Sequence, residues 1–373
     1  MFRNYKLRDY DFKLILMVLA LTAIGVVTIG SAEESLQVKQ LLGAVLGTGI
    51  MIGLSLFDYK LLLRLYWVMY VLNLVLLFLV MFIGEDHKGA QRWVEIGPIT
   101  FQPSETAKIL LILFFAQFIM KYEEKINTIK FLAACVVLVG IPWILIEKQP
   151  DLSTSIVVLV VFCIILFAGG ISWKYILAAF AVVIPALVII VSIAVQPDQT
   201  ILENHQQKRI LAFINPEEYS TAEAYQQLNS VMAIGSGQLN GKGYKNNEIT
   251  SVKNGDFISE AQTDFIFSVI GEEFGFKGCL VVICLMMGIA LECISVARRA
   301  KDMAGRIIAA GMGGLIAFQG FFNIGVTTFI LPNTGLPLPF VSYGLTSLVS
   351  CFIGIGIVMN VRLQSGRGVG QAS

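Results

Sequence analysis

The chain has 373 residues, of which 56% are hydrophobic and 14% are charged, and its mean hydropathy is +0.76. This composition excludes a water-soluble domain and predicts a protein that crosses a membrane several times. The formal net charge of +1 provides no overall positive field, so we expect no nucleic acid among the partners.

Ten apolar runs follow one another along the chain, and each can cross a bilayer as a helix if its flanks extend the shorter ones. They are Leu14–Ser31, Val38–Leu56, Leu61–Ile83, Ala107–Met120, Phe131–Ile146, Ser153–Ala168, Tyr175–Val195, Phe276–Ala297, Ala304–Ile330 and Phe340–Val361. None shows the two-residue alternation of a membrane barrel. The sequence therefore predicts an all-α polytopic membrane protein with about ten transmembrane helices, as a single domain over residues 1–373.

Basic residues gather at the same side of these runs. They are Arg3, Lys6, Arg8, Lys13, Lys60, Arg64, Lys121, Lys125, Lys130, Lys174, Arg298, Arg299, Lys301, Arg306, Arg362 and Arg367. By the positive-inside rule, both termini are expected to be cytoplasmic. The opposite connections then face outward, including a large loop, residues 196–264, between the seventh and eighth spans.

All six cysteines lie inside apolar runs, and no two have the spacing of a metal site. They are Cys135, Cys163, Cys279, Cys284, Cys293 and Cys351. We expect them to be small packing residues rather than disulfides or metal ligands.

Polar residues gather in four outward segments, of which Gly84–Thr106 is the first. Its glycines and prolines predict a structured turn, and Ser104 is placed to cap the next helix. Glu105 and Lys108 are three residues apart and share a helix face. Either they form a surface ion pair beside a capped helix, or Arg92 and Lys108 bind a phosphate together with helix N-terminal amides.

The second outward segment is Glu147–Leu152. Pro150 ends the preceding helix, and Asp151 can cap the following one. Capping does not account for the charged Glu147 and Lys148 at the membrane edge.

The third segment is the large loop, which contains closely spaced glycines at Gly235, Gly237, Gly241 and Gly243. They lack the strand and the spacing of a nucleotide-binding loop, so we expect backbone that lies close to a ligand or a neighbouring helix. The fourth segment, Leu331–Pro339, is rich in proline. It is either a rigid linker or a loop folded back over a cavity.

Asp264 ends the large loop, at the mouth of the eighth span. An ionisable residue at such a place is costly to desolvate, which favours a functional role. The alternative is a helix N-cap after Thr263, worth about 1 kcal/mol to the helix.

Together these segments resemble one family over essentially the whole chain. The resemblance rests on GAQRWVEIGPITFQPSETAK at residues 89–108, KQPDLST at 148–154, the RILAFINP and glycine-rich blocks within 209–243, TDFIFSVIGEEFG at 263–275 and FFNIGVTTFILPNTGLPLPFVSYG at 321–344. These motifs are similar to those of the RodA/FtsW/SpoVE family, also called SEDS. The Gly-Lys-Gly that ends the glycine-rich block and the short tails look more like the RodA branch, with a division or sporulation paralogue as the alternative. Gln262 and Leu345 depart from the family pattern, which often has His and Gly there.

The resemblance implies a peptidoglycan glycosyltransferase of the bacterial inner membrane that polymerises lipid II at the outer face for cell elongation. It also implies a class B penicillin-binding protein that supplies the crosslinks, other elongation-complex proteins as partners, and contact with membrane lipids.

For this chemistry, one base must take the proton of the acceptor hydroxyl, and we expect Asp264 in that role, with a pKa raised by partial desolvation. The departing pyrophosphate needs positive charge. Candidates for contacting it and the rest of the substrate are Arg92, Lys108, Lys148, Arg209, Glu105, Asp151, Gln226 and Ser342. A divalent cation, Mg²⁺ or Mn²⁺, held near Asp264, Glu105 and Asp151 is the alternative source of that charge.

Two other classes of function remain at this point. A lipid II flippase or transporter would place polar residues through the depth of the bundle, whereas Glu292 is the main charge within these spans. A non-catalytic scaffold for a transpeptidase is the second.

Overall fold

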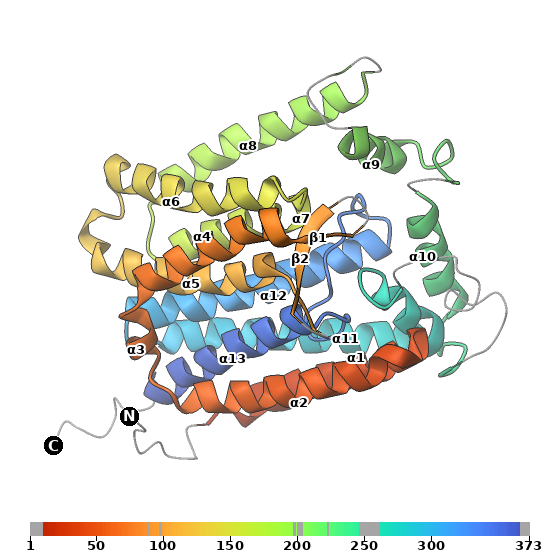
Figure 1. Cartoon of the computed structure of the whole chain (residues 1–373), viewed down its shortest axis with the longest axis horizontal. Helices are drawn as coiled ribbons and strands as arrows, with labels where there is room; N and C mark the ends of the chain where they lie inside the picture. Colours follow the sequence, from red (N-terminus) through yellow and green to blue (C-terminus); the bar gives the residue numbers. More distant parts are fainter. Residues whose placement is uncertain are drawn as a thin grey trace.

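The computed structural model describes residues 10–87, 90–96, 99–196, 199, 204–221, 224–245, 258 and 261–365. In these residues, ten apolar helices form a bundle (Figure 1). They are α1 (Phe12–Ala32), α2 (Glu34–Leu56), α4 (Tyr66–Ile83), α5 (Pro103–Lys121), α6 (Ile129–Glu147), α7 (Leu152–Ala168), α8 (Trp173–Ala194), α11 (Ile266–Arg299), α12 (Met303–Thr327) and α13 (Leu345–Ser365). Nine are long and apolar enough to cross a membrane, and α7 is shorter, with 17 residues. The prediction of an all-α polytopic membrane protein is confirmed.

Shorter elements connect the bundle helices. They include α3 (Tyr59–Leu63), the 3₁₀ turn η2 (Glu123–Lys125), α9 (Asn204–Ile214) and α10 (Tyr225–Ser236). Figure 1 shows α9 and α10 at one end of the bundle and α3 at the other, with α8 along its edge. Among the predicted basic residues, Arg3, Lys6, Arg8 and Arg367 lie outside the described residues, as do parts of the large loop.

The segment between α4 and α5 contains a small antiparallel sheet in place of the expected turn. Its strands are β1 (Glu85–His87), β2 (Ala90–Ile96) and β3 (Ile99–Phe101), in the order β1-β2-β3. The aromatic and β-branched residues of β2, such as Trp93 and Val94, favour extended backbone, and Val94 pairs with Phe101. The sheet replaces the turn expected there and carries Arg92.

The two ends of the described chain meet at one end of the bundle. The hydroxyl of Tyr10, just before α1, lies 2.6 Å from that of Ser55 near the end of α2. Asn360 in the last turns of α13 donates a 2.8 Å hydrogen bond to the Ser55 carbonyl. The chain therefore returns to the end of the bundle at which it began, as the predicted even number of spans requires.

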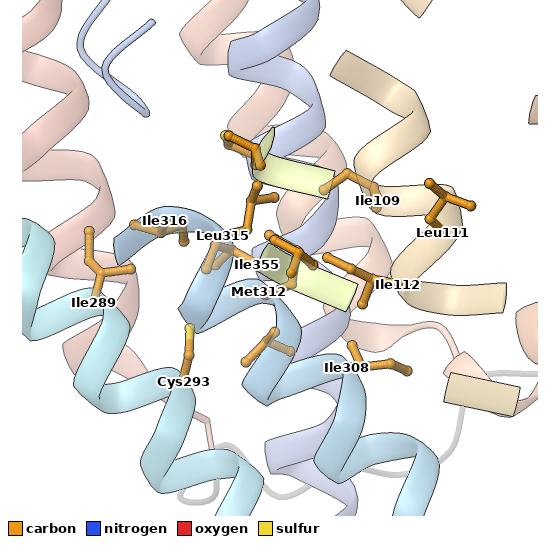
Figure 2. Packing of buried hydrophobic residues seen from close by; sticks show 14 of the residues in the cluster. Ile109, Leu111, Ile112, Ile289, Cys293, Ile308, Met312, Leu315, Ile316 and Ile355 are labelled. Carbon is orange, nitrogen blue, oxygen red and sulfur yellow. The ribbon is translucent and has the colours of Figure 1, made fainter. Parts of the chain in front are cut away.

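The core forms where α5, α11, α12 and α13 meet, as Figure 2 shows for Ile112, Cys293, Met312 and Ile355. Glycines let α2 and α13 approach closely, because a β-carbon on Gly47 would lie 2.2 Å from the Phe352 ring. Small residues commonly allow such packing between membrane helices.

The six cysteines are all free thiols in the structure. Four of them, Cys135, Cys279, Cys293 and Cys351, are buried as predicted. Cys163 and Cys284 are exposed on helix surfaces, so for these two the expected packing role was wrong. An apolar run does not show which of its residues face outward.

Helix α11 begins well before the predicted Phe276 and is broken at Gly275, where φ is +62°. The glycine-rich loop after α10 supplies hydrogen bonds at this break. The amides of Lys242 and Gly243 donate to the carbonyls of Glu272 and Glu273 over 2.9 and 3.0 Å. In return, the amide of Phe276 donates to the Gln238 carbonyl over 2.8 Å. The loop thus lies against a neighbouring helix, as predicted, and satisfies backbone groups that the break frees.

Two glycines make this close contact possible. A β-carbon on Gly237 would lie 1.9 Å from the Gly271 carbonyl oxygen, and one on Gly241 would lie 2.1 Å from that of Glu273. The nearby Lys242 ammonium also lies 3.0 Å from the buried Glu272 carboxylate. Gly237 and Gly241 therefore allow the loop to pack closely against α11.

Candidate active site

Asp264 lies in the turn that leads into α11 and is partly buried. The helix begins at Ile266, with Phe265 at the N-cap position and no side-chain capping bond. Asp264 therefore precedes the cap residue, and the structure does not support the N-cap alternative.

Three successive carbonyls fix this turn in place. The Gln262 carbonyl accepts from the Tyr343 amide at 2.9 Å, and the Thr263 carbonyl accepts from the Ser342 hydroxyl at 2.6 Å. The Asp264 carbonyl accepts from Nδ2 of Asn323 at 2.7 Å. All three hydrogen bonds are accepted by main-chain carbonyls. They fix the backbone at Asp264 and do not involve its carboxylate oxygens.

The proline-rich segment between α12 and α13 folds back onto this turn. Asn323 also donates to the Leu336 carbonyl at 2.7 Å, and Gln319 donates to that of Pro337 at 3.0 Å. Gly335 has φ of +73°, and a β-carbon there would lie 3.1 Å from Oδ2 of Asp264. Of the two interpretations of this segment, the structure supports the folded-back loop.

Ser342, a predicted substrate contact, holds this segment together in the structure. Its buried hydroxyl donates to the Thr263 carbonyl and accepts a 2.7 Å hydrogen bond from the Leu338 amide. These two bonds join the loop to the turn that carries Asp264. The structure therefore gives Ser342 a positioning role.

Asp151 caps α7, as predicted, with Oδ1 accepting from the Thr154 amide at 3.2 Å. Its Oδ2 accepts from the Ser104 hydroxyl at 3.2 Å and from Gln102 at 3.4 Å. Ser104 was expected to cap α5, but the N-cap residue is Gln102, and Pro103 takes the first helical position. Proline favours that position because its missing N–H has no helical partner there.

Arg92 reaches from β2 to the turn between α6 and α7. Its Nε donates to the Gln149 carbonyl at 2.9 Å, and Nη2 donates to that of Pro150. Its Nη1 lies 4.0 Å from Oδ1 of Asp151. The guanidinium thus holds the backbone that precedes α7 and brings a positive charge beside the Asp151 carboxylate.

Arg209 projects from α9 and is exposed. Surrounding protein atoms and the charge of Arg92 lower its pKa, while Asp264 and Asp151 act in the opposite direction. Arg209 therefore lies within electrostatic reach of Arg92, Asp264 and Asp151. Two arginines near each other repel, so an anion between them would relieve the repulsion.

Glu105 and Lys108 lie on one face of α5, as predicted, but they are buried and do not form a surface pair. The Lys108 ammonium lies 2.7 Å from the Glu105 carboxylate and donates to Gln319 at 3.0 Å. Lys108 also lines a narrow crevice with apolar residues of α5, α6 and α7. Because Gln319 binds the Pro337 carbonyl, this pair connects to the loop over Asp264 rather than to solvent.

The other two predicted contacts are Lys148 and Gln226. Lys148 is exposed at the C-cap of α6, next to the Gln149 carbonyl that Arg92 binds. Gln226 is partly buried on α10, whereas its neighbour Gln227 anchors that helix to the carbonyls of Val326 and Leu331, both at 2.9 Å.

Two of the three carboxylates that we expect near a divalent cation have partners within the protein. Glu105 pairs with Lys108, and Asp151 caps a helix. Among the residues that the structure describes, no group of three or more His, Cys, Asp or Glu is arranged to hold a metal ion.

Asn323 and Gln319 were not assigned roles from the sequence. Both are amide side chains inside the apolar run of α12, and both are buried. The sequence did contain one indication of a role, because a polar residue inside a membrane span is costly and often functional. Their partners, the Asp264 turn and the Leu331–Pro339 segment, are separated from them in the chain and become neighbours only in the fold.

Comparison with known proteins identifies relatives over nearly the whole length. The family model FTSW_RODA_SPOVE, described as "Cell cycle protein", matches residues 10–366. A Geobacter metallireducens protein named "Probable peptidoglycan glycosyltransferase FtsW" is 35% identical over 378 residues, covering 96% of this chain and 97% of its own. "Peptidoglycan glycosyltransferase MrdB" of Escherichia coli is 35% identical over 293 residues, covering 79% and 76%.

Solved structures share the fold. The rod shape determining protein RodA of Thermus thermophilus is similar with a TM-score of 0.69 and 27% identity, over 95% of this chain and 96% of that one. A chain from a structure described as "Structural coordination of polymerization and crosslinking by a peptidoglycan synthase complex" has a TM-score of 0.78 and 28% identity, over 96% and 99%.

Proposed function

Because the chain belongs to the RodA/FtsW/SpoVE family and is a peptidoglycan glycosyltransferase, we propose that it polymerises lipid II with Asp264 as the general base. The observation that carries this proposal is that the Asp264 turn, held by Asn323 and Ser342, lies within electrostatic reach of Arg209. One carboxylate with cations nearby is what glycosyl transfer from a pyrophosphate donor requires.

In the proposed reaction, Asp264 takes the proton of the acceptor sugar's 4-hydroxyl as that oxygen attacks the anomeric carbon of the donor. The bond from the anomeric carbon to the pyrophosphate oxygen breaks, and the pyrophosphate leaves with both electrons. A single displacement converts the α-linked donor into a β-1,4 bond, so one carboxylate suffices. The proton then passes from Asp264 to water.

The cationic residues have different proposed roles. Arg209 is exposed and is our first candidate for binding the pyrophosphate, and Lys148, which is also exposed, is the second. Arg92 binds backbone carbonyls, so it positions the α6–α7 turn and adds charge. Lys108 is paired with Glu105 inside the bundle, and we assign it to support of the loop over Asp264. A divalent cation stays a prediction, and it would need oxygen ligands from the pyrophosphate as well as from Asp264.

We further propose a bacterial plasma membrane location, cytoplasmic termini and an active site on the outer face, on the basis of the basic residues at the opposite helix ends. A class B penicillin-binding protein is the proposed partner, since a similar chain comes from a structure described as coordinating polymerization and crosslinking. A role in elongation is proposed from the motif resemblance, with division as the alternative because relatives carry both names.

A lipid II flippase remains the second candidate, because the Glu105–Lys108 pair and Gln319 put polar groups inside the bundle. One experiment separates the two functions. The purified chain and its transpeptidase partner are given labelled lipid II, with and without a chelator, and glycan strands are resolved by gel electrophoresis. Strands in the absence of a membrane gradient support polymerisation, and their loss with the chelator supports the cation. Translocation across vesicles without strand formation would favour the flippase.

A further inference from the structure

A polar groove of about 360 Å³ lies at the opposite end of α11 and α12 from the candidate active site. It is formed by Met120 near the end of α5, by Glu123 in η2, and by the turn from α11 into α12, at Lys301, Met303 and Arg306. The ends of membrane helices lie at the level of lipid headgroups. The groove therefore faces the boundary between the bilayer and water.

One acidic residue of the groove is already neutralised by the protein. Asp302 accepts a 2.8 Å hydrogen bond from the Tyr59 hydroxyl and lies 2.9 Å from the Lys60 ammonium. It also caps α12 by accepting from the Gly305 amide at 2.8 Å. The negative charge of Asp302 is therefore not available to balance Lys301 and Arg306, the cations that line the groove.

Three charged side chains remain for a ligand. Lys301, Arg306 and Glu123 are exposed, and none has an ion-pair partner among the residues that the structure describes. Two cations beside one carboxylate match a zwitterion in which a phosphate accompanies an amine. The partly buried side chains of Met120 and Met303 add an apolar surface at the same place.

We propose that this groove binds the headgroup of one phosphatidylethanolamine molecule from the adjacent leaflet. Its phosphate lies against Lys301 and Arg306, its ammonium lies near Glu123, and its glycerol and first acyl carbons cover Met120 and Met303. Basic pockets between membrane helices bind lipid headgroups. The volume falls in the range of about 300–1,000 Å³ that small-molecule sites occupy. The Glu123 carboxylate repels a headgroup that has a net negative charge and no amine.

The test measures lipid binding to the full-length protein by native mass spectrometry, with phosphatidylethanolamine and phosphatidylglycerol of the same acyl chains as probes. The double variant Lys301→Gln/Arg306→Gln is expected to bind phosphatidylethanolamine about tenfold more weakly, because two charge-assisted hydrogen bonds to phosphate are lost. Glu123→Gln is expected to remove the preference for phosphatidylethanolamine over phosphatidylglycerol. The matched control is Lys130→Gln, which changes an exposed lysine at the start of α6.

Several results would overturn the proposal. An equal loss in the Lys130→Gln control would mean general surface attraction rather than a site. Binding of soluble glycerophosphoethanolamine as tightly as phosphatidylethanolamine would mean a site for a free phosphodiester rather than for a membrane lipid. Unchanged lipid binding in the double variant, with loss of a co-purifying cytoplasmic protein, would mean a protein contact. If the double variant does not fold, Arg306→Gln is compared with Arg306→Lys, which is expected to retain most of the binding.

Discussion

Oδ2 of Asp264 lies 3.1 Å from the point that a β-carbon on Gly335 would occupy, and Gly335 has φ of +73°. Gly335→Ala therefore both strains the backbone and crowds the proposed base. We expect a loss of about 1–3 kcal/mol in stability and a polymerisation rate lower by at least about tenfold.

Gly170→Ala is the matched control for Gly335→Ala. Gly170 also has positive φ, at +92°, but a β-carbon there would meet nothing within 4 Å. It should lose stability without losing activity once folded. Equal specific activity of the two folded variants would show that the loop does not position Asp264. The measurements are thermal unfolding in detergent and glycan strand synthesis.

The buried pair of Glu105 and Lys108 predicts a non-additive response to mutation. Lys108→Met leaves the Glu105 carboxylate without the ammonium 2.7 Å away and is expected to cost roughly 3–5 kcal/mol. Adding Glu105→Gln removes the buried charge and should restore part of that stability. Unfolding free energies of the two single variants and the double variant test this, and strictly additive losses would show that the pair is not coupled.

Arg92 should not be replaceable by lysine. Its guanidinium binds two carbonyls through two different nitrogens, at Gln149 and Pro150, and an ammonium cannot reproduce that planar geometry. Each lost charged hydrogen bond is worth about 1.5–3 kcal/mol. We expect Arg92→Lys and Arg92→Gln to reduce kcat/KM by similar factors of roughly 10–100. Near-native activity of Arg92→Lys would show that only the positive charge matters.

Asp302 predicts a dependence of stability on pH. Burial would raise the pKa of Asp302, but hydrogen bonds from Lys60, the Gly305 amide and Tyr59 outweigh it, so the pKa lies below its usual 3.8. A depressed pKa contributes stability that is present above the unfolded value and is lost as pH falls through the folded value.

Asp302→Asn should therefore unfold at a lower temperature than native protein at neutral pH, with the difference narrowing below about pH 4. The matched control is Glu124→Gln, which changes an exposed carboxylate. If the difference in unfolding temperature stays constant down to the lowest pH at which the protein is soluble, Asp302 does not have a lowered pKa.

The helices and their caps were predictable because they depend on local sequence. Hydropathy marks the spans, and Pro150 followed by Asp151 indicates a helix end and a new cap, which the structure has. The spacing of Glu105 and Lys108 predicted their contact. Their burial was not predictable, because it depends on how α12 and α13 pack around α5.

The supports of the candidate site were less visible in the sequence. Asn323 is 59 residues from Asp264 in the chain, so their hydrogen bond exists only once α11 and α12 pack together. Likewise, the sequence around Gly275 does not indicate that the helix breaks there and bonds to the loop that contains Gly241. Every residue type has the same main-chain hydrogen-bonding groups, so a sequence does not show which of them will be partners. The sheet and the hydrogen bonds of Ser342 to main-chain groups were not predicted for this reason.

The most direct test of the central claim is the polymerisation rate of Asp264→Asn with purified lipid II and the transpeptidase partner. General base catalysis contributes roughly 10²–10⁴-fold, so the variant should lose at least about a hundredfold in rate while it keeps its unfolding temperature and its partner. Asp58→Asn, at the opposite end of the bundle, serves as the control. A folded, partnered Asp264→Asn protein that polymerises within a few-fold of native would contradict the assignment of Asp264 as the base.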